Sequence, residues 1–128
     1  MIVAPAPRRL ELLQWFGLFG GATAWVLQHG GLFALAVARC NPGSAVWGID
    51  ADVWKVVLTA GAALVALAAE AAAVSTWLAT RGIDESDAPP LGRIHFLSVC
   101  ATAGNVLFLG AIVLDGLGSL YWNPCLQA

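Results

Sequence analysis

The sequence predicts an all-α integral membrane protein with three transmembrane helices, in which residues 1–128 form a single membrane domain. Two observations carry this prediction. Of the 128 residues, 59% are hydrophobic and only 11% are charged, whereas a soluble domain carries roughly 25% charged residues. The apolar residues also lie in three blocks, and each block exceeds the about 20 residues that span a bilayer.

The first block predicts a helix over about residues 10–38, because no charged side chain occurs from Leu12 to Ala38. Arg8 and Arg9 precede the block, as basic residues precede the apolar part of a secretory signal peptide. The block is, however, far longer than the roughly 7–15 apolar residues of a signal peptide, and no clean Ala-x-Ala site follows it. We therefore expect a retained helix that ends at an Asn-Pro-Gly turn over residues 41–43.

The second and third blocks predict helices over about residues 53–80 and 93–121. The second is rich in alanine, the best helix former in water, and Gly82 ends it. A polar linker separates it from the third helix, which ends before Asn123. Residues 56–80 contain one charged residue, Glu70, and residues 94–128 contain one, Asp115.

The basic residues near the helix ends predict the orientation. One side of the membrane holds Arg39 and Lys55, and the other holds four residues: Arg8, Arg9, Arg81 and Arg93. Cytoplasmic loops carry the excess of Lys and Arg. We therefore expect the N-terminus in the cytoplasm and the C-terminus outside, in the periplasm or extracellular space.

The cysteines add a covalent prediction. Cys40 follows the first helix and Cys125 follows the third, so both lie in the same compartment. If that compartment is oxidising, a disulfide between them can form and persist, and the chain-entropy model gives it roughly 4 kcal/mol of stabilisation. The alternative is two unpaired thiols at the membrane surface. Cys100, inside the third helix, is expected to be a buried small hydrophobe.

Glu70 has two open interpretations. A carboxyl group within the membrane is costly and suggests a functional role, such as a proton relay or a cation site. Alternatively, a protonated Glu70 donates a structural hydrogen bond to a neighbouring helix or to a partner subunit. The candidate partners at similar depth are Thr23, Thr102 and Asn105.

Two histidines raise the hypothesis of a bound heme. His29 lies toward the outer face and His95 at the cytoplasmic face, roughly 25 Å apart along the membrane normal at helical rise, so one iron cannot take both. His29 is instead expected to pair with Asp115, which Lys55 could equally neutralise. No metal-binding spacing of Cys and His occurs. We expect no cofactor or metal held by this chain alone, no enzymatic activity and no nucleic-acid partner.

Small residues on the first helix predict close helix packing. Gly17 and Gly21 form a Gly-x-x-x-Gly motif, and Gly20 with Ala24 repeats the small spacing one position away. Such faces let helix backbones approach closely in lipid. We expect this face to serve assembly with other transmembrane subunits.

Three short stretches resemble a known family. They are residues 15–25 (WFGLFGGATAW) with the later Cys40, residues 92–97 (GRIHFL), and Asn123-Pro124-Cys125. Together they resemble small bacterial membrane proteins that are commonly encoded beside cytochrome c oxidase genes. The resemblance implies a location in the bacterial inner membrane and association with a respiratory oxidase or its assembly. It implies no catalytic residues, and Cys40 and Cys125 match the paired cysteines of that family.

We therefore expect an accessory or structural transmembrane subunit of a respiratory complex, most simply a cytochrome c oxidase, in contact with lipid and other transmembrane subunits. One alternative is a small oligomeric proton-coupled transporter or channel that uses Glu70. Another is an assembly factor that binds an oxidase transiently.

Overall fold

The computed structural model describes residues 7–41, 48 and 50–126. Three long helices, α1 (Pro7–Cys40), α2 (Ala51–Thr80) and α3 (Leu91–Tyr121), are followed by a short 3-10 helix, η2 (Pro124–Leu126). All three long helices are long and apolar enough to cross a membrane, which confirms the predicted fold class. The turn expected at residues 41–43 lies largely outside the described residues.

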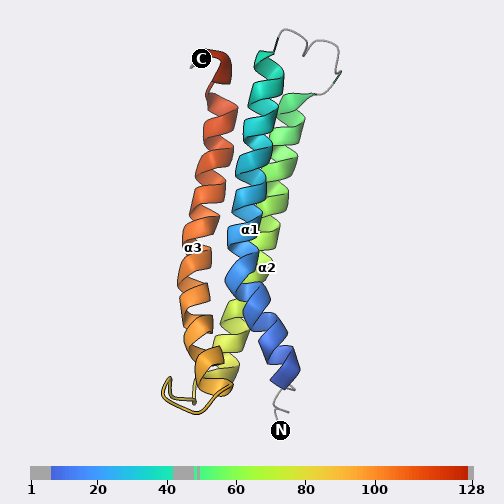
Figure 1. The fold of residues 1–128 in the computed structure, drawn as a ribbon. Coiled ribbons are helices and arrows are strands. Elements are labelled where there is room, and N and C mark those ends of the chain that lie inside the picture. Colours follow the sequence, from blue (N-terminus) through green and yellow to red (C-terminus); the bar gives the residue numbers. More distant parts are fainter. Residues whose placement is uncertain (1–6, 42–47, 49, 127–128) are drawn as a thin grey trace.

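The three helices run side by side, and each contacts the other two (Figure 1). The start of α1 and the connection between α2 and α3 lie at one end of the bundle, which we call the linker end. The end of α1, the start of α2 and η2 lie at the other, which we call the disulfide end. The two ends of the described chain are therefore on opposite sides of the bundle.

The start of α2 and the linker after it are held by side-chain hydrogen bonds to the backbone. The Asp50 carboxylate caps α2 by accepting from the backbone N–H groups of Asp52 (3.1 Å) and Val53 (3.2 Å), a role typical of Asp at a helix start. In the linker, Asp84 accepts from both the backbone and the hydroxyl of Ser86. These hydrogen bonds hold the pKa of Asp84 below its usual value.

The buried positions of each helix recur every three or four residues. On α1 they are Leu10, Gln14, Gly17, Gly20, Gly21, Ala24, Gln28 and Leu32, and α2 and α3 show the same spacing. This repeat is that of a left-handed coiled coil, in which one narrow face of each helix meets its neighbours. Most members are small or polar, and the large apolar side chains lie on the outside of the bundle, where a membrane protein meets lipid.

The glycines of α1 are packed against the other two helices of the same chain. A Cβ added to Gly17 would lie 3.0 Å from the Ala73 nitrogen, and one added to Gly20 would lie 2.8 Å from Ala69 Cβ. A Cβ on Gly21 would overlap the Asn105 amide. Within this chain α2 and α3 therefore occupy Gly17 and Gly21, while Gly20 and Ala24 also line a groove on the outside; the expected role of this face in assembly with other subunits stays a prediction.

The disulfide end is closed by a covalent bond. Cys40 and Cys125 form a disulfide with a Cα–Cα distance of 5.4 Å, which ties η2 to the end of α1. The predicted pairing is thus present. Cys100 differs from the prediction, because it is a free cysteine exposed on the outside of α3.

Candidate functional site

The charged groups near the disulfide end form one network. Asp52 accepts from Arg39 (2.8 Å) and from the buried Lys55 (2.9 Å). The suggestion that Lys55 neutralises Asp115 is therefore wrong, because Lys55 is bound to Asp52, three residues before it on the same helix. A paired Lys can be buried at a helix end where an unpaired one could not.

Asp115 is held by two aromatic side chains of α1. Its Oδ2 atom accepts from Trp25 Nε1 (3.0 Å) and lies 3.0 Å from His29 Nδ1. The rings of Trp25 and His29 are in contact, with centroids 5.5 Å apart. The predicted pairing of His29 with Asp115 is present in the structure, and Trp25 is an additional member. Because the carboxylate fixes Nδ1, the Nε2 side of the imidazole points away from this contact.

Gln28 joins all three helices one turn further into the bundle. Its Nε2 atom donates to the Ile112 carbonyl (2.9 Å) and to Thr59 Oγ1 (3.2 Å). Gln28 Oε1 is buried and has no hydrogen-bond partner among the described residues. In lipid, polar side chains that bridge helices contribute to helix association, so Gln28 fixes the register of α1 against α2 and α3.

Glu70 lies on α2 one residue after Ala69, which contacts Gly20 of α1. Asn105 is the polar side chain next to its carboxyl group, and it donates to the Gly17 carbonyl (2.8 Å). Glu70 Oε2 is buried without a hydrogen-bond partner in the described part of the chain. Of the expected partners, Asn105 is thus the one brought to Glu70. Thr102 donates to the Ser98 carbonyl, and Thr23 lies on the opposite, α1–α2 side.

A second set of polar side chains lies between Glu70 and the linker end. Gln14, Thr76 and Ser98 are all fully buried, at 0% exposure. The Thr76 and Ser98 hydroxyls donate to carbonyls of their own helices. Both polar atoms of the Gln14 amide lack a partner among the described residues. Closer to the end, Thr80 Oγ1 lies 3.1 Å from His95 Nδ1.

On the other side of Glu70 the interior becomes apolar. Ala24, Ala62, Ala66 and Ile112 form the hydrophobic core cluster, which we call the Ala/Ile layer. Ala66 lies one turn from Glu70 on α2, and Ala24 lies one turn before Gln28 on α1. The layer therefore separates the polar groups around Glu70 from those around Gln28.

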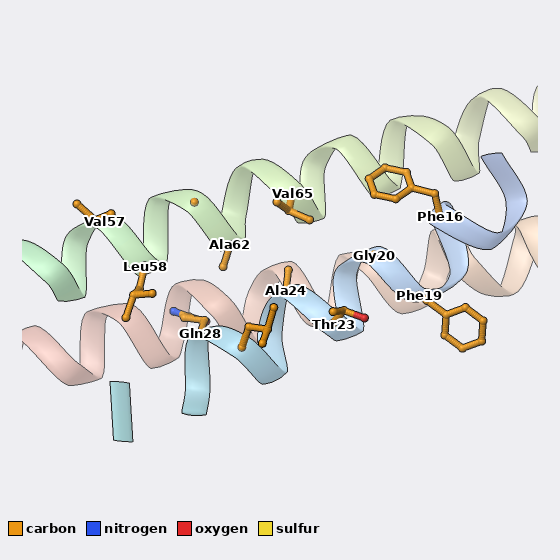
Figure 2. Close-up of a pocket in the computed structure, with 12 residues that line it drawn as sticks. Phe16, Phe19, Gly20, Thr23, Ala24, Gln28, Val57, Leu58, Ala62 and Val65 are labelled. Atoms are coloured by element: carbon orange, nitrogen blue, oxygen red, sulfur yellow. The ribbon is translucent and has the colours of Figure 1, made fainter. Parts of the chain in front are cut away.

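The outside of the bundle carries a groove between α1 and α2, with a volume of about 480 Å³. Figure 2 shows its lining side chains along the facing sides of the two helices. Small residues (Gly20, Thr23, Ala24, Gly61 and Ala62) alternate with larger apolar ones (Phe16, Phe19, Leu27, Val57, Leu58 and Val65), and Gln28 completes the lining. The groove is thus an apolar hollow on a surface that lies within the membrane.

Three of the residues that shape the interior were not singled out from the sequence. Gln14, Trp25 and Thr59 bear no charge and lie within apolar blocks, so composition does not mark them. A seven-residue repeat does mark one of them: Gln14, Gly21 and Gln28 are spaced by seven, and all three are buried.

The potential metal ligands are scattered over the structure. Within the described residues, no group of three or more His, Cys, Asp and Glu side chains could hold a metal ion.

A comparison with protein-family models finds no match for this chain, and searches of the curated proteins and of the solved structures find no similar protein. The candidate sites that follow from the structure are therefore the polar interior and the α1–α2 groove.

Proposed function

We propose that this chain is an accessory transmembrane subunit, which assembles with a larger membrane complex through the groove between α1 and α2. The observation that carries the proposal is the groove itself. Inside the membrane, helices associate through close van der Waals packing at small residues. Gly17 and Gly21 of α1 are already packed within the chain, whereas the groove presents Gly20 and Ala24 on one side and, on the other, Gly61 with no atom within 4 Å of its Cβ position. A transmembrane helix of a partner subunit fits such a surface.

The resemblance of residues 15–25, 92–97 and 123–125 favours a bacterial cytochrome c oxidase as the complex, in the inner membrane. In this role the chain supplies a rigid, covalently closed bundle against which an oxidase subunit packs. Its polar interior then serves the stability and register of the bundle, and the redox chemistry belongs to the partner.

Filling the groove tests this proposal. Gly61→Leu adds a side chain whose Cβ has no atom of the bundle within 4 Å, so the fold should be retained while partner packing is lost. We expect the tagged wild-type chain, purified in mild detergent, to co-elute with heme absorbance and oxidase subunits, and Gly61→Leu to lose most of both. Overpacking of a filled interface costs about 1–3 kcal/mol, which is enough for roughly a tenfold loss of complex.

The matched control is Gly110→Leu on α3. Gly110 is also exposed and has no atom within 4 Å of its Cβ position, but it does not line the groove. This variant should co-purify like the wild type. Equal recovery from both variants would exclude the groove as the assembly surface, and the absence of heme from the wild-type preparation would exclude the oxidase.

We also propose that the linker end faces the cytoplasm. Arg8, Arg9, Arg81 and Arg93 support this orientation through the positive-inside bias, and a disulfide at the other end is compatible with an oxidising compartment. A reporter fused after Ala128 should be active only as a periplasmic reporter, and one inserted after Glu85 only as a cytoplasmic reporter. The reverse pattern would contradict the proposal.

A proton-coupled transporter is the second candidate, and the partly buried Glu70 is the observation in its favour. Transport needs access to the carboxyl group from both compartments, and the Ala/Ile layer closes the interior on one side of it. Proton flux into vesicles that contain the protein, abolished by Glu70→Gln, would favour this candidate over the accessory role.

A further inference from the structure

We propose that the half of the bundle nearest the linker end binds internal water, and that this water connects Glu70 to the compartment at the linker end for proton exchange. The path is one-sided, because the Ala/Ile layer separates Glu70 from the disulfide end. This inference concerns the polar interior and does not depend on the accessory role proposed for the groove.

The helix register brings the polar groups together in a layer. Gly17 faces Ala73 across the α1–α2 contact. Gln14 and Thr76 both lie three residues from this contact toward the linker end, because the two helices are antiparallel. On α3, Ser98 lies seven residues, or two turns, before Asn105, which contacts α1 at Gly17 and Gly21.

The same register also indicates where this path reaches the linker end. Thr80 lies one turn beyond Thr76 on α2, and its hydroxyl contacts His95 Nδ1 at the start of α3. His95 is partly exposed. Polar side chains thus extend from the linker end through the layer of Gln14, Thr76 and Ser98 to Asn105 and Glu70.

Buried polar atoms without hydrogen-bond partners in this region indicate bound water. Gln14 is 0% exposed, yet its amide offers a donor and an acceptor that no described residue satisfies. Glu70 Oε2 is in the same situation. Buried polar groups in native proteins are nearly always hydrogen-bonded to protein or to ordered water, and an internal water typically makes about three such bonds. The Thr76 and Ser98 hydroxyls each donate to their own helix and keep a lone pair that can accept from water.

On the opposite side of Glu70, the buried Gln28 Oε1 also lacks a partner among the described residues, but it lies beyond the Ala/Ile layer. The next residues toward the disulfide end are the alanines and isoleucine of the Ala/Ile layer. No other titratable side chain faces Glu70 at its depth in the described helices. On α1 the nearest are Glu11 and His29, and on α3 the nearest are His95, Asp115 and the outward-facing Cys100. A proton released by the Glu70 carboxyl therefore passes to water on the linker side, and a proton from that compartment restores the acid.

Infrared difference spectra after a rapid pH change can test this inference on the full chain in lipid nanodiscs. The carboxyl band of Glu70 is assigned by its loss in Glu70→Gln. Gln14→Leu replaces the unpaired amide by an apolar side chain of similar size. It should lower the rate at which the Glu70 band changes about tenfold, which corresponds to a barrier about 1.4 kcal/mol higher. Thr76→Val should act in the same direction.

The matched control is Gln28→Leu, which makes the same chemical change on the far side of the Ala/Ile layer and should leave the rate unchanged. Far-UV circular dichroism establishes that each variant is folded, and Thr76→Val carries the test if Gln14→Leu does not fold. The inference is wrong if Gln28→Leu slows the band and the linker-side variants do not. It is equally wrong if all variants respond at the wild-type rate, or if Glu70 shows no titrating band.

Discussion

Replacing Gly21 by leucine should unfold the helix bundle rather than merely weaken its association with a partner. The position has no room for a side chain, because even a Cβ would overlap the Asn105 amide. Overpacking typically costs about 1–3 kcal/mol. Displacing Asn105 would also leave the buried Gly17 carbonyl without its hydrogen bond, at a further cost of about 1–3 kcal/mol. The expected result is a large drop in the sodium dodecyl sulfate fraction that unfolds the protein in mixed micelles.

Gly30→Leu on the same helix provides the control for Gly21→Leu. Gly30 is exposed and nothing lies within 4 Å of its Cβ position, so the leucine should be neutral or slightly stabilising because it favours the helix by up to about 1 kcal/mol. Similar unfolding curves for the two variants would show that α1 does not meet α3 at Gly21.

Removing the disulfide should produce the second large loss of stability. Cys40 and Cys125 are separated by 85 positions in the sequence, and the chain-entropy model gives about 4–5 kcal/mol for closing a loop of this length. Cys40→Ser should therefore unfold at a clearly lower sodium dodecyl sulfate fraction than the wild type, and reducing the wild-type protein should reproduce the shift. Without reductant, peptide mapping should recover the linked pair.

Cys100→Ser is the natural control, because Cys100 is free and exposed on the outside of α3. It should unfold like the wild type. If Cys40→Ser and Cys100→Ser unfold alike, or if Cys40 and Cys125 are both alkylated freely in protein isolated without reductant, the disulfide does not stabilise this bundle.

The helices could be predicted from the sequence because the bilayer imposes a simple requirement. A spanning segment must be long, apolar and internally hydrogen-bonded, and composition alone reveals such segments. The same topology places Cys40 and Cys125 on one side of the membrane, since two spans lie between them, and left unpaired thiols as the alternative to the disulfide that is present. The ends of α2 and α3 accordingly lie within two residues of the prediction.

The inner face of each helix was harder to predict, because lipid and helix interfaces are both apolar. Hydrophobicity therefore does not show which face of a helix is buried. The buried face is determined instead by close packing at small residues. The glycines of α1 were recognised as a packing face, but the sequence does not say whether Ala69 and Ala73 of the same chain or a separate subunit meets them. Likewise, the sequence offers no reason to prefer Thr23 or Asn105 as the partner of Glu70. In the structure Thr23 lines the groove, whereas Asn105 is the polar side chain next to the Glu70 carboxyl group.

The position of the disulfide also makes its formation depend on the insertion of α2 and α3. Cys125 follows α3, so its sulfur shares a compartment with that of Cys40 when α2 and α3 have both crossed the bilayer or when neither has. A chain in which one of the two helices failed to insert alone would leave the two thiols in different compartments. An oxidised chain is therefore one in which neither helix was left out alone, and the fraction of reduced chains in a membrane preparation sets an upper limit on the fraction with that wrong topology.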